Sequence, residues 1–517
     1  MSEASLNAHS HDSDDHLSTY HLKSSITTRT VSGAIVSGGG QLTQLVLTVA
    51  YNAILARLLS PHDFGIVAMA MVAAGLLQIF KSAGLSTATI QRENITRAQV
   101  SNLFWINVAI GCAAMLAMAA TAPMVASFFH QPELVSVSVA LSVGFLLEGV
   151  IVQHMAILSR QMRFTLVAGL DLSCTAAGSL VGVIMALTNW GYWSLVGATL
   201  STGAFRVTAV WSLSRWRPER PTRRNGTGSL VKFGADLTLV GVVYAVSRGC
   251  DALLIGRFIG IDAVGLYSRA TALVTRPLER LLAPVYAVIV PALSRLQSEP
   301  ERYRKVFIQV FDGVAIVSFG LTGLVFPLAD PLVRVILGDK WDAAIPIFAA
   351  LTLAFLSRPL ATATSWLYTS QGRGRDLLVT ACIEATLIVG AFLGGLPFGA
   401  TGVAVAYSAT TLLVVLPLTF HIGGRRGPVT TSDLWRATTS HLPIFGMVLA
   451  TTWLTRDWIA PSLPPISQLV FSSAIGCLVG LATTLAFPRS RRVMIALLAR
   501  LKNLKSKQIN TQVEAIA

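Results

Sequence analysis

Long apolar stretches, each about the length of a bilayer-crossing helix, follow one another along most of the 517 residues. A helix needs roughly 20 mostly apolar residues to cross the hydrocarbon of a membrane. Runs of that length, separated by Pro, Gly or charged clusters, predict fourteen transmembrane helices. Their approximate ranges are 31–55, 63–83, 100–126, 134–154, 165–188, 191–213, 231–254, 263–292, 305–328, 343–367, 376–396, 399–421, 437–458 and 465–487. The pattern therefore predicts an all-α, polytopic membrane protein.

The basic residues between these ranges test the count, because Lys and Arg collect on the cytoplasmic side of membrane proteins. Nearly all of them fall on one side when the spans alternate in direction. The opposite side receives only Arg57, Arg257, Arg334, Lys340 and Arg456. We therefore expect a multi-pass protein with both termini in the cytoplasm.

Composition supports the membrane assignment. Hydrophobic residues make up 53% of the chain and charged residues 13%, well below the roughly 25% charged residues of ordinary soluble domains. The net charge of +15 follows from many cytoplasmic loops, so nucleic acid is not expected as a partner. The five cysteines are scattered singly along the chain, so neither a structural metal site nor a set of disulfide bonds is expected. The polar, His-containing residues 1–30 predict a disordered tail rather than a signal peptide, with a metal-binding tail as the alternative.

An internal repeat divides the predicted helices. Residues 56–70 (ARLLSPHDFGIVAMA) align without a gap to residues 256–270 (GRFIGIDAVGLYSRA), so that Gly65 matches Gly265, and Gly191 matches Gly399 more weakly. An even offset in helix number indicates two parallel six-helix lobes. The predicted domains are a tail (1–30), an N-lobe (31–213), a basic linker (214–230), a C-lobe (231–421), two extra C-terminal helices (437–487) and a basic tail (488–517). The linker is a solvated loop or, alternatively, a site for anionic lipid headgroups.

Three arginines mark one face of the predicted helix 263–292. Arg269, Arg276 and Arg280 follow one another at steps of seven and four, with Glu279 beside them. An ionisable group at mid-bilayer costs about 2.5–3.5 kcal/mol, so these residues indicate a cavity suited to a phosphate or pyrophosphate group. The alternative is a helix that is partly outside the membrane, with Arg276 at a proline kink and Arg280 reaching the interface.

The preceding predicted helix carries a second charged face. Asp236, Tyr244, Arg248 and Asp251 fall at steps of eight, four and three, which places Arg248 and Asp251 close enough to pair. Arg248 is a further candidate for substrate binding. Asp236 and Asp251 are candidates for coupling to an ion, or else for a structural ion pair inside the bundle.

The first lobe is polar rather than charged. Gln41, Gln44, Thr48 and Asn52 recur at steps of three and four and form a hydrogen-bonding stripe on the first helix. This stripe either contacts sugar hydroxyls or bridges neighbouring helices. The grouping of Asn102, Trp105 and Asn107 is a weaker sugar-contact signal, because tryptophans at a membrane interface commonly serve as anchors.

Isolated charges also occur inside several spans. Glu148, Asp171 and Glu384 are single acids that are candidates for carrying a coupling proton, and Arg358 adds one positive charge. There is no nucleotide-binding P-loop, no nucleophile elbow and no HExxH motif. We therefore predict a transporter without catalytic residues, metal or cofactor, driven by an ion gradient or by its substrate gradient.

Several extended segments resemble one family of transporters. They are ARLLSPHDFGIVAMA (56–70), GLSTATIQRENITRAQVSNLFWIN (84–107), SRQMRF (159–164), KFGADL (232–237), LLIGRFIGIDAVGLYSRA (253–270) and RPLERLLAPVYAVIVPALSRLQ (276–297). Together they resemble the polysaccharide-transporter family of Wzx-type oligosaccharide flippases, a branch of the MOP superfamily. The resemblance extends over about residues 25–490.

This resemblance implies a bacterial inner-membrane protein that moves an undecaprenyl-diphosphate-linked oligosaccharide from the cytoplasmic to the periplasmic leaflet. The product would be exopolysaccharide, capsule or the O-antigen of lipopolysaccharide, and a polysaccharide polymerase and co-polymerase are candidate partners. It also implies a MATE-like fold of two six-helix bundles around a central cavity, alternating access and coupling to H⁺ or Na⁺. Two other functions remain open: a multidrug extruder of the same superfamily, for which the arginine face is unsuitable, and a scaffold that does not transport.

Overall fold

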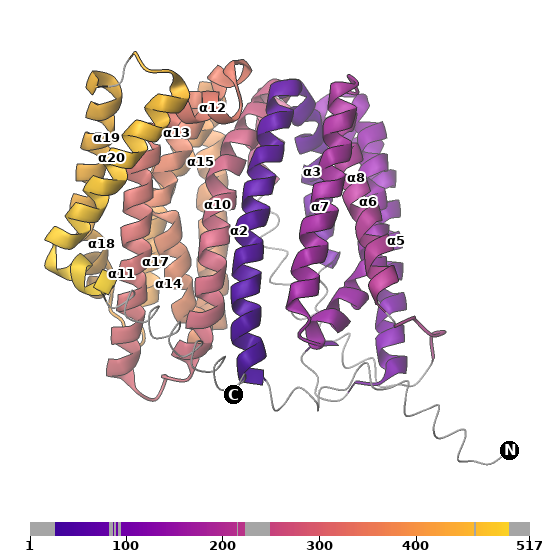
Figure 1. Ribbon diagram of the computed structural model, residues 1–517, viewed down its shortest axis with the longest axis horizontal. Helices are drawn as coiled ribbons and strands as arrows, with labels where there is room; N and C mark the ends of the chain where they lie inside the picture. Colours follow the sequence, from indigo (N-terminus) through magenta and orange to yellow (C-terminus); the bar gives the residue numbers. More distant parts are fainter. Residues whose placement is uncertain are drawn as a thin grey trace, which may run out of the picture. The chain divides into compact units, whose positions relative to one another are not determined.

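The computed structural model consists of helices and the turns that join them over the residues it describes, which are 26–81, 86, 89–90, 95–214, 216–222, 249–459 and 462–495. Figure 1 labels the helices and colours them along the chain, from indigo to yellow. The chain divides into two compact units, Met1–Gly265 and Leu266–Ala517. Each unit is described separately below.

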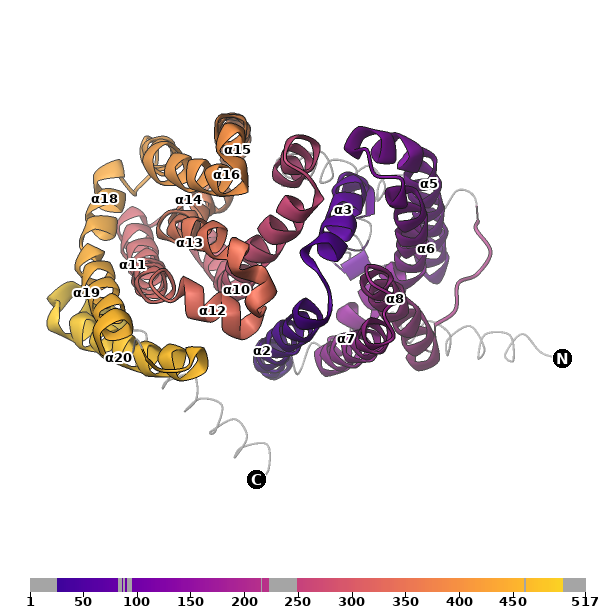
Figure 2. The ribbon, with the colours of Figure 1, turned by 90° about the horizontal axis from the view of Figure 1, so that it is seen from above.

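The first unit is a bundle of long helices. Its members are α2 (Ile26–Leu58), α3 (Pro61–Lys81), α5 (Arg97–Phe129), α6 (Glu133–Arg160), α7 (Phe164–Leu187) and α8 (Trp193–Leu213), followed by a helical stretch at 249–258 and the first residues of α10 (Ile261–Ser294). Figure 2 shows α5 beside α6 and α7 beside α8. Helix α6 also packs on α3 and α8, while α2 packs on α7.

Side-chain caps fix where two of these helices begin. The Ser60 hydroxyl and amide both donate to the Asp63 carboxylate, at 2.6 and 2.9 Å, just before α3. Thr96 and Gln99 form a reciprocal pair at the start of α5, in which each side chain accepts from the other residue's backbone N–H. Such boxes satisfy backbone groups that lack partners at a helix N-terminus.

The second unit contains the following elements: α11 (Pro300–Val325), α12 (Ala329–Ile336), η2 (Asp339–Ala344), α13 (Ile345–Leu353), η3 (Ala354–Leu356), α14 (Arg358–Ser370), α15 (Gly374–Gly395), η4 (Leu396–Phe398), α16 (Gly399–Thr410), η5 (Thr411–Val415), α17 (Leu416–Gly424), α18 (Thr431–Thr439), α19 (Leu442–Leu454), η6 (Thr455–Ile459) and α20 (Pro465–Ala486). Its core joins α11, α14 and α17 through Tyr303, Phe307, Phe311, Trp366 and Phe420, all of them fully buried. The hairpin of α19 and α20 packs against α11.

Seven segments among the described residues are long and apolar enough to cross a membrane, or eight if the bent helix α10 is counted as one more. One of the seven, Gly374–Gly424, is 51 residues long and turns back at Leu396–Phe398. Because α15 and α16 pack side by side, this segment consists of two antiparallel helical parts. Every predicted range contains helix, although only residues 249–254 of the range 231–254 are described. The total of fourteen crossings stays a prediction.

Two features differ from the helices expected from sequence. The range 343–367 is broken into α13, η3 and α14, because Pro359 in the first turn of α14 has no amide hydrogen and its ring excludes a continuous α-helix. The short helices α12 and α18 were not predicted. At eight and nine residues, they fall below the length on which the span pattern depends.

The same helix-ending turn occurs in both units. After α6, Met162 has φ +55° and the Arg163 amide donates to the Leu158 carbonyl at 3.1 Å. After α14, Gly372 has φ +69° and the Arg373 amide donates to Tyr368 at 2.8 Å. Gly191 and Gly399, which precede α8 and α16, likewise both have positive φ. The internal repeat stays a prediction from the sequence.

A buried ionic cluster fastens the end of the last long helix to α11. The Asp312 carboxylate, 5% exposed, accepts two bonds from Arg489, at 3.1 Å each, and lies 3.0 Å from Nε2 of the fully buried His441. Nδ1 of that histidine is 2.9 Å from the Ser490 hydroxyl. This Asp312 cluster therefore joins α11, the start of α19 and the helical segment 488–495.

Candidate functional site

The three predicted arginines lie on one uninterrupted part of a helix. Helix α10 runs straight from Ile261 to Arg280 and turns by 45° before Val285. Arg276 is exposed, and Arg269 and Arg280 are half-buried. Eleven residues separate the first from the last, or about 16 Å along the axis. The helix thus presents a row of guanidinium groups that are not enclosed in a packed core.

The predicted charged face before α10 is only partly visible. Asp236, Tyr244 and Arg248 lie outside the described residues, so the pairing of Arg248 with Asp251 stays a prediction. Asp251 is half-buried at the start of the helical stretch 249–258, where its carboxylate accepts from the Ala252 amide at 2.7 Å.

The polar stripe on α2 forms hydrogen bonds within its own helix and to α7. The Gln44 amide lies 3.5 Å from the Thr175 hydroxyl of α7, and the Asn52 amide donates to the Thr48 carbonyl at 2.6 Å. Gln41 is half-buried on the same helix. Gln44 therefore takes part in bridging α2 and α7, the second of the two roles expected from sequence.

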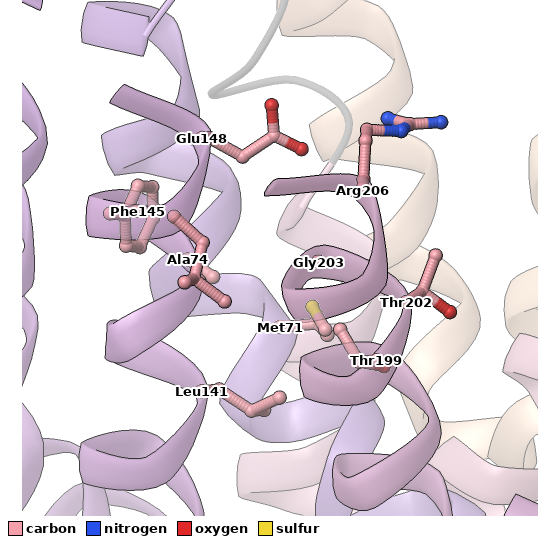
Figure 3. Close-up of a pocket in the computed structure, with 11 residues that line it drawn as sticks. Met71, Ala74, Leu141, Phe145, Glu148, Thr199, Thr202, Gly203 and Arg206 are labelled. Atoms are coloured by element: carbon pink, nitrogen blue, oxygen red, sulfur yellow. The ribbon is translucent and has the colours of Figure 1, made fainter. Parts of the chain in front are cut away.

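A mainly apolar pocket with a few polar groups lies within the first unit, among α3, α6 and α8 (Figure 3). It encloses about 340 Å³. Phe145 and Leu141 of α6 face it together with Met71 and Ala74 of α3, and these side chains form an apolar wall. Its polar groups are Glu148 of α6 and, from α8, Thr199, Thr202 and Arg206.

An ion pair connects this pocket to α7. The Arg206 guanidinium donates to the Asp171 carboxylate at 2.6 Å, and both side chains are mostly buried, at 23% and 31% exposure. Asp171 therefore has a partner that the sequence reading did not identify. A single arginine within the apolar stretch 191–213 was the signal that could have predicted it, because a charge inside a bundle requires a nearby counter-charge.

The second unit contains a similar pair. Arg358 at the start of α14 forms an ion pair with Glu384 of α15, and the two side chains are 36% and 22% exposed. The two charges were considered separately in the sequence, because they are 26 positions apart with a turn between them. Two of the three isolated acids, Asp171 and Glu384, are thus paired with an arginine of a neighbouring helix.

The weaker sugar-contact signal on α5 serves a different purpose. The Asn102 amide donates to the Thr222 carbonyl at 2.8 Å and accepts from the Thr222 amide at 2.9 Å. The Trp105 indole donates to the Glu219 carbonyl at 2.8 Å. These bonds hold residues 216–222, which we call the strap, along α5. Part of the predicted linker is therefore fastened to the bundle instead of being freely solvated.

The described residues contain no group of three His, Cys, Asp or Glu side chains placed to hold a metal ion. What the spans present is a row of arginines and a pocket with hydrogen-bonding groups. Such groups can bind a polar solute within the membrane by charge and hydrogen bonding.

Comparison with known proteins decides the family. A family model described as "Polysaccharide biosynthesis protein" matches residues 54–346, more than half of the chain. The chain belongs to this family. Relatives of this polysaccharide biosynthesis protein include the lipopolysaccharide biosynthesis protein WzxC of Escherichia coli, 24% identical over 74% of this chain and 78% of WzxC. The succinoglycan biosynthesis transport protein ExoT of Rhizobium meliloti is 25% identical over 71% of this chain and 74% of ExoT.

Solved structures show the fold. The lipid II flippase MurJ in an inward closed conformation has a TM-score of 0.68 at 13% identity, over 89% of this chain and 99% of MurJ. An inward-facing multidrug resistance MATE transporter of the MOP superfamily has a TM-score of 0.57 at 15% identity, over 78% of this chain and 99% of that one. This polysaccharide biosynthesis protein is therefore a multi-pass membrane protein of MATE/MurJ-like fold.

Proposed function

We propose that the protein is a flippase for undecaprenyl-diphosphate-linked oligosaccharide repeat units. It would carry them from the cytoplasmic to the periplasmic leaflet of the bacterial inner membrane, where they are assembled into exopolysaccharide, capsule or O-antigen. The family assignment supports this function, as does the similarity to a succinoglycan transport protein.

The observation that carries the proposal is the row of arginines on α10. A pyrophosphate group bears several negative charges, and guanidinium groups bind phosphate oxygens through paired, charge-assisted hydrogen bonds. Arg269, Arg276 and Arg280 supply such donors along about 16 Å of helix that is not enclosed in the core. Arg248 is proposed to add a fourth.

In the proposed mechanism, the glycan and pyrophosphate occupy a polar cavity while the polyprenyl chain stays in lipid. No sugar hydroxyl then crosses hydrocarbon without a hydrogen-bond partner. The protein would have fourteen spans, two six-helix lobes that alternate in access, and cytoplasmic termini. Binding of H⁺ or Na⁺, with Asp236 and Asp251 as proposed coupling residues, would bias the lobes toward one state.

The test is the leaflet distribution of the lipid-linked intermediate in cells depleted of this protein. We expect the undecaprenyl-diphosphate-linked oligosaccharide to accumulate on the cytoplasmic leaflet while extracellular polymer is lost. Complementation with Arg276→Ala should restore less polymer than Arg276→Lys, and Arg295→Ala, an exposed arginine just after α10, should restore it fully. Normal transfer of the intermediate in depleted cells, together with altered drug sensitivity, would contradict the flippase function and favour a drug extruder.

A further inference from the structure

Two short helices of the second unit each follow directly on a segment that is long and apolar enough to cross a membrane. Helix α18 comes after Gly374–Gly424, and the helical segment 488–495 comes after α20, which ends at Ala486. The hairpin of α19 and α20 lies between them in the chain, so both are at the same end of that hairpin (Figure 1). Because a bilayer-crossing helix ends among the lipid headgroups, both short helices lie at headgroup level.

Hydrogen bonds fix the two short helices next to each other. One guanidinium nitrogen of Arg489 donates to the Arg436 carbonyl and to the Ser440 hydroxyl at the end of α18, at 3.3 Å each. The same guanidinium is bound to the Asp312 carboxylate of α11 at 3.1 Å. The exposed faces of α18 and of the segment 488–495 therefore belong to one surface.

Both helices are amphipathic, with an exposed face at the spacing of helical turns. In α18, Leu434, Ala437 and Thr438 are buried. The exposed residues of the two helices are Ser432, Trp435, Arg436 and Thr439 in α18, and Pro488, Arg491, Arg492 and Ile495 in the second helix. We call these residues the basic face. Each half of it sets a large apolar side chain beside arginine, since Trp435 is 36% exposed and Ile495 is 55% exposed.

The arginines of the basic face are not neutralised within the described part of the chain. The side chains of Arg436 and Arg491 take part in no hydrogen bond or ion pair among the described residues, and Arg492 donates to a carbonyl of its own helix at 3.3 Å. Asp433, the carboxylate of α18, is already paired with Arg304 of α11 at 2.6 Å. Positive charge on this face therefore lacks a counter-charge in the described structure.

This combination suits the headgroup of an anionic phospholipid. A guanidinium binds phosphate oxygens through paired, charge-assisted hydrogen bonds, and basic residues at a membrane surface attract anionic lipids. Tryptophan is enriched at headgroup level because its ring is amphipathic. A zwitterionic headgroup brings a cation of its own, which the arginines repel, and free phosphate offers no apolar contact to Trp435 or Ile495.

We propose that the basic face binds the phosphodiester of an anionic phospholipid of the cytoplasmic leaflet, such as phosphatidylglycerol, through Arg436 and Arg491, with Trp435 among the headgroups. The bound lipid holds the open end of the α19–α20 hairpin at the membrane surface. The choice of leaflet follows from the proposed topology. The binding chemistry depends neither on the flippase function nor on the arginines of α10.

Native mass spectrometry of the full-length protein in detergent tests the proposal. The probes are phosphatidylglycerol and phosphatidylcholine with the same acyl chains, titrated separately. We expect phosphatidylglycerol to bind at least about fivefold more tightly, and Arg436→Gln combined with Arg491→Gln to abolish most of this preference, because each basic residue near an anionic headgroup contributes a factor of about five. Equal binding of the two lipids, or unchanged binding in the double variant, would overturn the proposal.

A matched pair of single variants locates the binding. Arg491→Gln should weaken phosphatidylglycerol binding about fivefold. Arg295→Gln should leave it within about twofold of wild type, because Arg295 is an exposed arginine of the same unit that does not belong to the basic face. An equal loss in both variants would overturn the proposal in favour of a diffuse attraction to all the basic residues on that side of the membrane.

Two further measurements separate lipid binding from other causes. The unfolding temperature of the double variant without added lipid should equal that of wild type, because neither altered side chain bonds to the described structure. Arg436→Lys combined with Arg491→Lys keeps both charges and should retain most of the preference for phosphatidylglycerol. The same spectra report oligomeric state: a wild-type dimer that the glutamine variant dissociates, without any lipid preference, would assign the face to a second copy of the chain and overturn the proposal.

Discussion

Gly65 and Gly265 each lie against the residue that begins the other's helix. A Cβ atom on Gly65 of α3 would be 2.3 Å from the carbonyl oxygen of Ile261, the first residue of α10. A Cβ atom on Gly265 of α10 would be 1.9 Å from the carbonyl oxygen of Pro61, the first residue of α3. The contact is reciprocal, at positions that correspond in the repeat at an offset of 200 residues. It relates residues 61–65 and 261–265 by a local twofold symmetry.

Gly65→Ala and Gly265→Ala should therefore each destabilise the protein by about 1–3 kcal/mol, the usual cost of forcing an extra carbon into a packed contact. The obstructing atoms are backbone oxygens, which cannot turn aside as a flexible side chain would. Thermal unfolding of the purified protein in detergent measures the effect.

Gly75→Ala is the control for this prediction. Gly75 lies on α3 as Gly65 does, but nothing is within 4 Å of a Cβ placed there. Alanine in a helix interior is favoured over glycine by roughly 0.5–1 kcal/mol, so this variant should be unchanged or slightly more stable. A loss of stability equal to that of Gly65→Ala would contradict the close contact.

The pair of Arg206 and Asp171 predicts a coupled response to mutation. Arg206→Met should destabilise the first unit by about 1–3 kcal/mol, since it leaves a mostly buried carboxylate without its guanidinium partner. Asp171→Asn in the same chain should recover part of that loss. A double-mutant cycle of unfolding midpoints measures the coupling, and simple additivity of the two single effects would show that the pair contributes nothing.

The contact between α11 and α18 predicts a dependence on pH. Two hydrogen bonds from Arg304, at 2.6 and 2.9 Å, lower the pKa of Asp433 from 3.8 to about 2. Because the folded pKa is below the unfolded one, the stabilisation is complete above about pH 4 and is lost as the pH falls toward 2. With Arg304 43% exposed, we expect it to amount to about 1–2 kcal/mol.

Stability measured between pH 6 and pH 3 checks this prediction. Asp433→Asn should be less stable than wild type at pH 6, and the difference should shrink as the pH approaches 3. A difference in stability between wild type and Asp433→Asn that stays constant from pH 6 to pH 3 would mean that the carboxylate charge does not stabilise the protein.

The strap offers a prediction about protease access. The strap is hydrogen-bonded to Asn102 and Trp105 of α5. Its Glu219 side chain also forms an ion pair with Arg97 at 2.9 Å, so several contacts keep residues 216–222 on α5. Asn102→Ala removes two of the hydrogen bonds and should accelerate cleavage after Glu219 by a glutamyl endopeptidase severalfold. Thr121→Ala, which changes an exposed hydroxyl of α5 that bonds only its own helix in the described structure, is the control. Equal cleavage rates would show that the strap is held by other contacts.

Much of the helix pattern could be predicted, because the length of apolar runs is set by the thickness of the bilayer and can be counted along the chain. The matched glycines Gly65 and Gly265 could also be identified from the sequence, and both lie at backbone contacts that tolerate no side chain. The turns at Met162 and Gly372 were not identified as equivalent. Their shared backbone conformation is held by hydrogen bonds between main-chain atoms, and these place little demand on side-chain identity.

The candidate site was harder to predict, because its pairs join different helices. Spacing along one helix reveals faces such as that of Arg269 and Arg276, but not which helix lies opposite. Arg206 and Asp171 are 35 residues apart and meet only through the packing of α8 on α7. Asn102 and Trp105 look like sugar-binding residues in isolation, and only the path of the strap shows that their polar atoms already have partners.

The Asp312 cluster bears on how the protein is made. The carboxylate of Asp312 enters the membrane with α11, yet Arg489 and Ser490 are synthesised more than 170 residues later. During that interval a group destined for burial lacks the cation that neutralises it. A nascent or truncated chain that ends before Arg489 would keep the Asp312 carboxylate in its helical bundle without this arginine. The packing of α11 is therefore complete only when the segment 488–495 has been made.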